Sequence, residues 1–200
     1  MYALVEDNEV KQIITNPKSL VIGDVRYPAK IFQLWSKSEL NTIGIYEVVT
    51  DSSNKKDEAY YINTNEEYNY ADNQVTRSWG AATAKKLEDE NATYANGDPV
   101  LDDDGNQVVN YGLKTEKKKI IKDQASGLLS PTDWYVVKAT EVADYSVPAN
   151  ITTFRADVRA KSNEMETQID ACTTVEQLET LYTRDENGTR PLAEFPKEVV

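Results

Sequence analysis

Few residue types in this chain could carry out chemistry. Its 200 residues include no histidine and a single cysteine, Cys172. Without an imidazole, neither a Ser-His nor a Cys-His nucleophile pair can be built, and the commonest zinc sites lose a ligand. One cysteine cannot form a disulfide within the chain. Because Cys172 continues an apolar helical stripe, we expect it to be a small core residue.

Carboxylates are abundant, and their densest run is Asp102-Asp103-Asp104-Gly105-Asn106. A twelve-residue calcium loop of the EF-hand type has glycine at its sixth position. With Gly105 there, the first ligand would be Val100 and the twelfth Tyr111, and neither is a carboxylate. The run instead predicts a tight turn between two apolar arms, because glycine readily adopts the positive φ that such a turn needs.

No two carboxylates lie in the pattern of aromatic residues and glycine turns that is typical of a glycosidase cleft. An enzyme, such as a glycosidase or a peptidoglycan-degrading enzyme, is therefore the least favoured class. We expect no catalytic residue, no cofactor and no metal.

The overall charge argues against nucleic acid as a partner. The chain has net charge −12 and a pI near 4.5, whereas nucleic-acid binding needs clustered Lys and Arg. The one basic run, Lys117 to Lys119 with Lys114 and Lys122 nearby, is expected on a solvated helix face. No apolar run approaches the ~20 residues of a membrane span, and the first six residues lack the basic start of a signal peptide. We expect no membrane partner.

Charge and composition predict an α+β protein with three regions. Residues 51–110 carry 5 basic and 13 acidic side chains, while residues 1–50 have net charge −1 and residues 111–200 have net charge −3. We expect a small N-terminal β-rich unit with a short helix over residues 1–50. A hairpin-rich acidic region follows over residues 51–112, and a helical C-terminal region with a helical hairpin covers residues 113–200.

Local signals place the elements of the N-terminal region. Short apolar runs at residues 2–5 and 10–14 predict a β-hairpin. Ser36 and Glu39 form a capping-box pattern for a short helix that Gly44 ends, and a strand is expected over residues 43–49.

The middle region is predicted to alternate strands and turns. Strands are expected at residues 58–63 and 74–79, separated by a turn over residues 65–73. Four tyrosines surround that turn, and a tyrosine-lined loop could contact a protein or a sugar. The alternative is that Tyr60 and Tyr61 simply alternate in and out of a sheet. The four tyrosines are Tyr60, Tyr61, Tyr68 and Tyr70.

The C-terminal region is predicted to be helical. A helix over residues 114–129 is stopped by Ser130-Pro131, and residues 134–137 are expected to be extended. The last dozen residues are expected to form a tail that either docks or stays free. Thr173 with Glu176 predicts the start of a final helix.

A single apolar stripe marks the long helix that begins after Pro148. Its members recur at helical spacing over about six turns. Packing within the chain is favoured, since Ser162 and Asn163 interrupt the stripe, but the spacing also fits a heptad, so self-association stays open. We expect the Trp134 side chain to be buried in the core, where it would pack against these helices. The stripe consists of Ile151, Phe154, Val158, Met165, Ile169 and Cys172. The interaction candidates in this region are Trp134, Phe154, Val158 and Met165.

Two motifs resemble a known family. Leu128-Leu129-Ser130-Pro131-Thr132-Asp133-Trp134, followed about twenty residues later by Thr153-Phe154-Arg155 and Val158-Arg159, is similar to the tail assembly chaperone and tail-fibre-associated proteins of tailed bacteriophages. The module Trp35-Ser36 to Glu39-Leu40, then Ile43-Gly44-Ile45-Tyr46, also resembles the opening of phage tail accessory proteins. The resemblance covers the first fifty residues and about residues 115–170, and it leaves the acidic middle without a counterpart.

The resemblance implies a non-enzymatic structural or interaction protein of the virion tail, made in the host bacterial cytoplasm. Its partners would be other tail, baseplate or fibre proteins, with a homo-oligomer through the C-terminal helices as a further possibility. The alternative is a cytosolic assembly chaperone that leaves before the particle matures.

Overall fold

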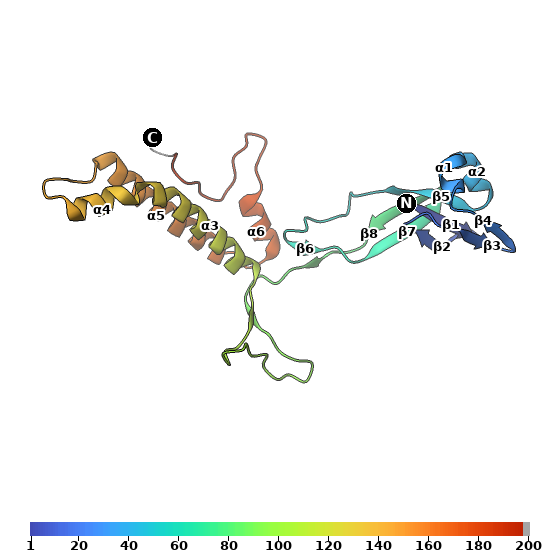
Figure 1. Ribbon diagram of the computed structural model, residues 1–200, viewed down its shortest axis with the longest axis horizontal. Coiled ribbons are helices and arrows are strands. Elements are labelled where there is room, and N and C mark those ends of the chain that lie inside the picture. The colour runs from blue at the N-terminus through green and yellow to red at the C-terminus, as the bar shows by residue number, and fades with distance from the viewer. Residues whose placement is uncertain (198–200) are drawn as a thin grey trace. The chain divides into compact units, whose positions relative to one another are not determined.

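The computed structural model describes residues 1–197 and has the α+β class expected from the sequence (Figure 1). The chain forms two compact units, Met1–Thr83 and Ala84–Val200. Their boundary falls inside the acidic region 51–112 that the charge pattern grouped together.

A five-stranded sheet forms the centre of the first unit, in the order β2-β1-β5-β8-β7. Strands β5 and β8 are parallel and the other neighbours are antiparallel. The strands are β1 (Tyr2–Glu6), β2 (Glu9–Ile14), β3 (Leu20–Ile22), β4 (Val25–Tyr27), β5 (Ile45–Thr50), β6 (Tyr61–Ile62), β7 (Glu66–Ala71), β8 (Gln74–Trp79) and β9 (Thr83–Ala84). The helices are α1 (Ile31–Leu34) and α2 (Lys37–Thr42).

The two faces of β1 bury different side chains. Leu4 packs with Ile14 and Ile45 and with residues of α1 and α2. Ala3 and its neighbour Val5 pack instead with residues of β7 and β8. The pairing of β1 with β2 shifts register between Leu4 and Val5, while the side chains of β1 keep alternating between the two faces.

The predicted turn over residues 65–73 is wrong, because most of it is strand β7. The reversal needs only Asp72 and Asn73, whose φ values of 52° and 58° suit a two-residue hairpin turn. The predicted strand 58–63 is also wrong for most of its length and shrinks to β6. Asp57 caps a turn there instead, since its side chain accepts a hydrogen bond from the Ala59 amide at 2.8 Å.

The capping box that opens α2 is confirmed. The Ser36 side chain accepts a hydrogen bond from the Glu39 amide, and the Glu39 carboxylate accepts one from the Ser36 amide at 2.7 Å. Gly44 follows the helix with φ 79°, and a Cβ there would lie 2.6 Å from the Val5 carbonyl oxygen. Only glycine fits this corner without strain.

The second unit is mainly helical. An antiparallel pair, α3 and α5, forms its centre and buries Ala125 against Phe154 and Val158. The helices are α3 (Leu113–Leu129), the 3-10 helix η1 (Ser130–Thr132), α4 (Asp133–Glu141), α5 (Ala149–Asp170) and α6 (Val175–Tyr182). The apolar stripe is confirmed as an internal one, because its six members from Ile151 to Cys172 are each at most 5% exposed.

Two local predictions in this unit are wrong. Residues 134–137 are helical rather than extended, because Pro131 lies at the start of η1, where its missing N–H is not needed, and the chain continues into α4. The final helix is capped one residue later than expected, by Thr174, whose side chain accepts a hydrogen bond from the Gln177 amide.

The C-terminal tail docks on the helices through residues 191–193, and its last three residues, 198–200, lie outside the described part of the chain. Leu192 is 2% exposed and its amide donates to the Leu181 carbonyl. The Gln168 side chain donates to the Pro191 carbonyl at 3.1 Å and accepts from the Ala193 amide at 2.9 Å.

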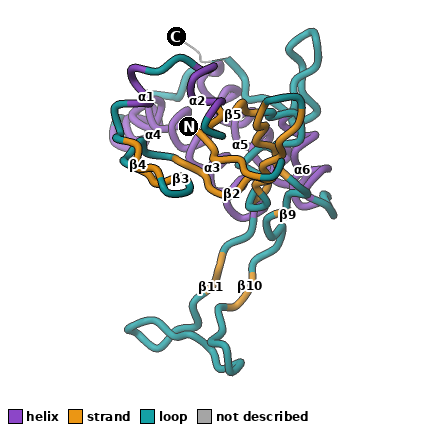
Figure 2. The backbone as a smooth tube through the Cα atoms, turned by 90° about the vertical axis from the view of Figure 1, so that its right-hand side faces the viewer, coloured by secondary structure: helices purple, strands orange, loops and turns teal. Residues whose placement is uncertain are grey.

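Residues 88–112 form a two-stranded arm that ends in two loops (Figure 2). Its strands are β10 (Glu90–Asn91) and β11 (Val109–Asn110). Beyond them, the amides and carbonyls of Ala92, Val100 and Val108 form a closed ring of three hydrogen bonds of 2.8–2.9 Å. The Gln107 amide nitrogen lies 2.8–3.1 Å from the three carbonyl oxygens of that ring. The Gln107 side chain therefore donates hydrogen bonds to the backbone carbonyls where the two loops meet.

Candidate functional site

The structure separates the four candidate tyrosines into two pairs. Tyr60 and Tyr61 are each 5% exposed and belong to the core of the first unit. Tyr68 and Tyr70 lie on β7, where they are half-buried two residues apart, and both pack on the Ala3–Val75 cluster. None of the four lies on the free turn that the sequence suggested.

Side-chain hydrogen bonds fix the second pair in the sheet. The Tyr70 hydroxyl lies 2.9 Å from that of Tyr46 and 3.0 Å from Asn73 Oδ1. This hydrogen bond, followed by burial, raises the pKa of Tyr46. Burial and a hydrogen bond to Glu66 raise the pKa of Tyr68. Both hydroxyls stay protonated at neutral pH, and the Tyr68 hydroxyl donates to the Glu66 carboxylate at 2.9 Å.

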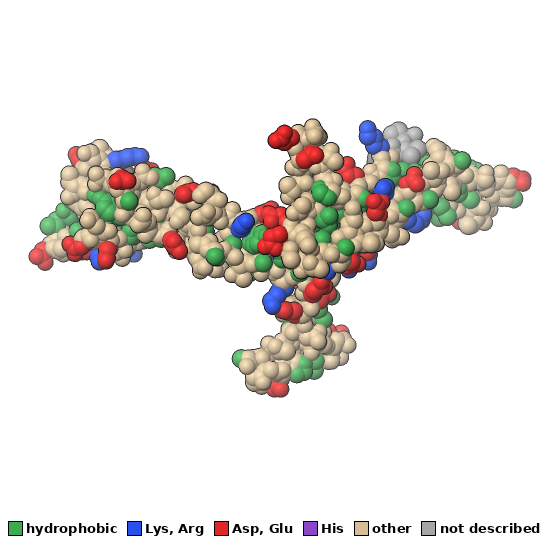
Figure 3. All heavy atoms as spheres, turned by 180° about the vertical axis from the view of Figure 1, so that it is seen from behind, with side chains coloured by type: hydrophobic (Ala, Val, Ile, Leu, Met, Phe, Trp, Pro, Cys, Tyr) green, Lys and Arg blue, Asp and Glu red, His purple; other side chains and the backbone are tan. Residues whose placement is uncertain are grey.

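Trp134 is wrong as a core plug, because it is 52% exposed. It lies in α4, a nine-residue helix without a single buried residue. Val136 and Val137 are 40% and 52% exposed in the same helix, and Val142 just after it is 48% exposed. On the face drawn in Figure 3, apolar side chains reach the surface at the end of the helical unit. We call Trp134, Val136, Val137 and Val142 the α4 surface.

A largely buried arginine holds α4 in position. Arg155 on α5 is only 11% exposed and forms an ion pair with Asp133 at 2.8 Å. Its guanidinium also donates to the Leu129 carbonyl at 2.9 Å and to the Thr132 hydroxyl. These contacts join the end of α3, η1 and the start of α4, and we call this junction the elbow. The elbow holds the α4 surface in a fixed position.

Aromatic and cationic side chains stack along α4. The rings of Trp134 and Tyr135 lie 3.8 Å apart between centroids. The Lys138 ammonium lies 5.9 Å from the Trp134 ring and 4.4 Å from the Tyr145 ring. These contacts restrict the Trp134 side chain while leaving half of it in solvent.

The other three candidates of this unit do not join Trp134 at the surface. Phe154, Val158 and Met165 are 4%, 0% and 1% exposed. They bind α5 to its neighbours within the chain, so an oligomer would have to use other faces of these helices.

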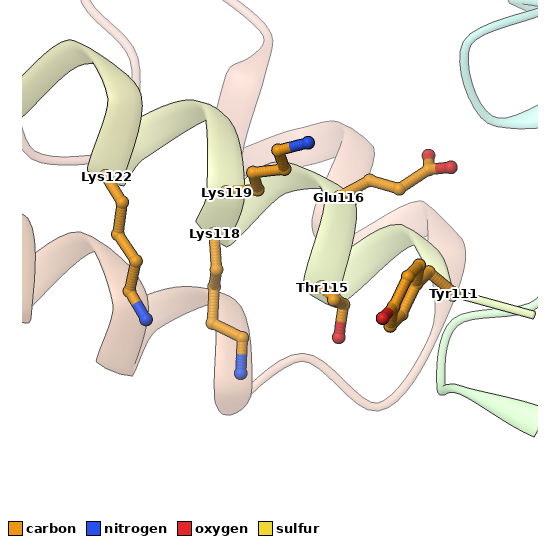
Figure 4. Close-up of a pocket in the computed structure, with 6 residues that line it drawn as sticks. All are labelled: Tyr111, Thr115, Glu116, Lys118, Lys119 and Lys122. Carbon is orange, nitrogen blue, oxygen red and sulfur yellow. The ribbon is translucent and has the colours of Figure 1, made fainter. Parts of the chain in front are cut away.

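Three lysines of the basic run, Lys118, Lys119 and Lys122, line a cavity of about 680 Å3 (Figure 4). Figure 4 shows the Lys118 and Lys122 side chains extending from the same side of α3 as Thr115 and the Tyr111 ring. Lys118 pairs with Asp170 at 2.7 Å, and this hydrogen bond raises the pKa of the lysine.

Most of this positive charge is neutralised within the unit. Lys122 lies 3.3 Å from Glu166, and Lys114 is buried rather than solvated, with its ammonium donating to Glu88 and to the Asp170 carbonyl. The ion pairs of these lysines therefore mainly connect α3 to α5 and to the base of the arm. Little unpaired positive charge remains in the cavity to bind an anion.

Comparison with known proteins adds no relative: no protein-family model, curated protein or solved structure matches the chain. Within residues 1–197, no group of three or more acidic, Cys or His side chains is arranged to hold a metal ion. In the same residues, no helix is long and apolar enough to span a bilayer.

Proposed function

We propose that this chain is a non-enzymatic structural protein of a tailed bacteriophage virion that bridges tail, baseplate or fibre components. The α4 surface is the observation that supports the proposal. A helix of nine residues that leaves Trp134 and Val137 half in solvent gains little from the fold of its own chain. A partner protein would cover it.

The energetics favour a protein as that partner. Covering an exposed Trp or Val side chain contributes on the order of 1 kcal/mol or more at about 25 cal/mol per Å2 of apolar area. Tryptophan is also among the residues that most often dominate binding energy at interfaces. Because Arg155 already holds the elbow, little conformational entropy is lost on docking.

The resemblance of the Leu128–Trp134 segment to phage tail proteins supplies the biological setting. That segment contains the elbow and the first residue of the α4 surface, so the part of the chain that carries the resemblance is also the part that exposes apolar area. The virion tail is accordingly the proposed location, after synthesis in the host bacterium.

The test compares phage particles that contain either the wild-type chain or the variant Trp134→Asp/Val137→Asp. We expect mass spectrometry of purified, washed particles to find the wild-type chain in stoichiometric amounts and the variant at least about tenfold depleted, since charge at a desolvated contact costs more than 1.4 kcal/mol. The matched control is Val21→Asp, which changes a 61% exposed valine of the first unit. Urea unfolding should give the same midpoint for all three chains.

Absence of the wild-type chain from washed particles would contradict the virion assignment. If unassembled tail proteins then accumulated in cells lacking the chain, the α4 surface would be that of an assembly chaperone. Equal incorporation of the double variant would remove α4 as the docking element.

A further inference from the structure

A second cavity lies where the C-terminal tail leaves α6, and it is independent of the α4 surface. Its volume is about 400 Å3, and Arg184, Thr189 and Arg190 are among the residues that line it. The loop is well held, because Asp185 Oδ1 accepts hydrogen bonds from the amides of Asn187 and Thr189 at 2.9 and 2.8 Å.

The residues that follow the loop are also anchored. The carbonyl of Pro191 accepts a hydrogen bond from Gln168, and Leu192 is buried. The segments before and after Arg190 are therefore both anchored. The Arg190 guanidinium also lies 5.8 Å from the centre of the Tyr182 ring. The cavity is preorganised around this side chain.

Within residues 1–197, the Arg190 guanidinium has an ion-pair contact with Glu194 but makes no hydrogen bond. It carries five N–H donors, its side chain is 24% exposed, and its buried Nε makes no hydrogen bond within residues 1–197. The nearest carboxylate oxygen, Glu194 Oε1, lies 3.4 Å from Nε and already accepts from Arg184 at 2.8 Å. A partly buried donor without a partner is unfavourable, and such groups commonly mark a place for a missing acceptor.

The hydroxyls around the cavity show where an acceptor would bind. Those of Thr180 and Thr183 donate to carbonyls of their own helix at 2.7 and 3.0 Å, so their protons are in use. The Thr189 hydroxyl has no partner among the described residues and is free to donate. Donors for a ligand thus come from Arg190, Thr189 and the remaining N–H groups of Arg184.

We propose that this cavity is a carboxylate-binding site centred on Arg190. The planar fork of a guanidinium matches the two oxygens of a carboxylate. Both arginines already lie beside the single carboxylate of Glu194, and Asp185 also lines the cavity, so a ligand with one negative charge meets less repulsion there than a ligand with two. A phosphate dianion would leave a local charge of −2 on a chain whose net charge is −12.

The test is a titration of the full-length chain with sodium acetate, followed by NMR at the Arg190 Nε–Hε signal, with sodium chloride at equal ionic strength as the reference. We expect a saturable shift at millimolar acetate that chloride does not produce. A short blocked peptide with one glutamate distinguishes the source of the carboxylate. Tighter binding than acetate assigns the site to a peptide partner, and equal binding assigns it to small carboxylic acids.

Variants separate the Arg190 site from general charge effects. Arg190→Gln should abolish saturation at the Thr189 amide, and Arg190→Lys should weaken acetate binding by about tenfold because a lysine lacks the fork. Arg159→Gln is the matched control, since Arg159 is an exposed arginine on α5 and its loss should change nothing.

Glu194→Gln decides whether the chain fills the site itself. Removing this internal competitor should strengthen acetate binding severalfold. Binding seen only in Glu194→Gln and not in the wild-type chain would overturn the proposal, because Glu194 would then be the ligand. No saturable shift at 100 mM acetate (about a hundredfold above millimolar affinity), or tighter binding of inorganic phosphate than of acetate, would also overturn it.

Discussion

Single side chains set the ends of several segments in this protein, and Glu39 is the best defined of them. Its carboxylate accepts a hydrogen bond from the Ser36 amide at 2.7 Å and another from the Ser36 hydroxyl. Both bonds are stronger to the ionised carboxylate than to the protonated group, and they hold the pKa of Glu39 below its ordinary value. The first turn of α2 therefore depends on a charge.

The lowered pKa of Glu39 predicts how α2 responds to acid. A depressed carboxyl pKa contributes stability above the unfolded-state pKa of about 4.3, and that contribution is lost as pH falls through the lower folded-state pKa. We expect Glu39→Gln to remove this part of the pH dependence. An NMR titration of the wild-type chain should place the Glu39 pKa below that of the same group in urea.

Ser36→Ala is the control for this titration. It removes the hydroxyl bonds but keeps the Ser36 backbone donor, which is the larger cause of the shift, so the pKa of Glu39 should rise only part of the way. The variant should also lose about 1 kcal/mol of stability through the missing cap. A Glu39 pKa that is the same folded and unfolded would refute the capping argument.

At the level of elements, the sequence predicted best where one short pattern decides the structure. The stripe from Ile151 to Cys172 has a helical period, and the capping box at Ser36 needs only residues within four positions. The prediction for β7 was wrong because the pairing of β7 with β8 depends on a two-residue turn at Asp72-Asn73. The sequence pattern was interpreted as a longer turn that included this strand.

The candidate site was harder to predict than the fold for a physical reason. Exposure of Trp134 depends on whether α5 covers α4, and local periodicity does not contain that information. The elbow rests on Arg155 and Asp133, which are 22 positions apart. The partners of Arg190 are likewise set by how the tail folds back. Spacing alone could not have placed either arginine.

The arm has a signal that sequence reasoning missed. Ala92, Val100 and Val108 recur every eight residues, and Gly97 and Gly105 occupy equivalent turn positions between them. The loops also make equivalent hydrogen bonds across their turns. The Tyr94 amide donates to the Asp98 carbonyl at 2.8 Å, and the Asp102 amide donates to the Asn106 carbonyl at 2.9 Å. The two loops of the arm are thus copies of one turn, joined at the ring of three hydrogen bonds that Gln107 closes.

Gln107→Glu should open the end of the arm while leaving the rest of the unit folded. The carboxylate cannot donate, so its negative charge would face three carbonyl oxygens that keep only their backbone donors. We expect hydrogen exchange at the amides of Ala92, Val100 and Val108 to quicken by about tenfold or more, which corresponds to about 1.4 kcal/mol of local opening. The neighbouring change Asn106→Asp is less suitable as a control, because the Asn106 side chain approaches Asp102.

Asp103→Asn serves as the matched control for Gln107→Glu. This variant replaces a carboxylate with an amide, the reverse of the change in Gln107→Glu. Within the described residues, the Asp103 side chain makes no hydrogen bond that the variant would lose. Exchange at the three ring amides should stay as in the wild-type chain. Unchanged exchange in Gln107→Glu would show that the backbone ring holds without the side chain.

At the level of the whole molecule, both units are acidic and each has its own apolar core. The first has 8 basic and 12 acidic residues, and the second has 14 and 22. Repulsion between like-charged copies favours solubility. It offers a reason why a chain that exposes the α4 surface would stay dispersed before it met the partner that we propose.

Separate cores predict that a core defect stays within its own unit. Val75 of β8 and Val158 of α5 are both 0% exposed, in clusters that share no residue. Each Val→Ala change should cost about 1.5–3 kcal/mol through lost burial and the cavity left behind. Hydrogen exchange should show Val75→Ala weakening protection across β1, β5 and β8 while α3 and α5 keep theirs, and Val158→Ala doing the reverse. Because the two variants serve as controls for each other, a loss of protection spreading through the whole chain in either one would mean that the units unfold as one cooperative body.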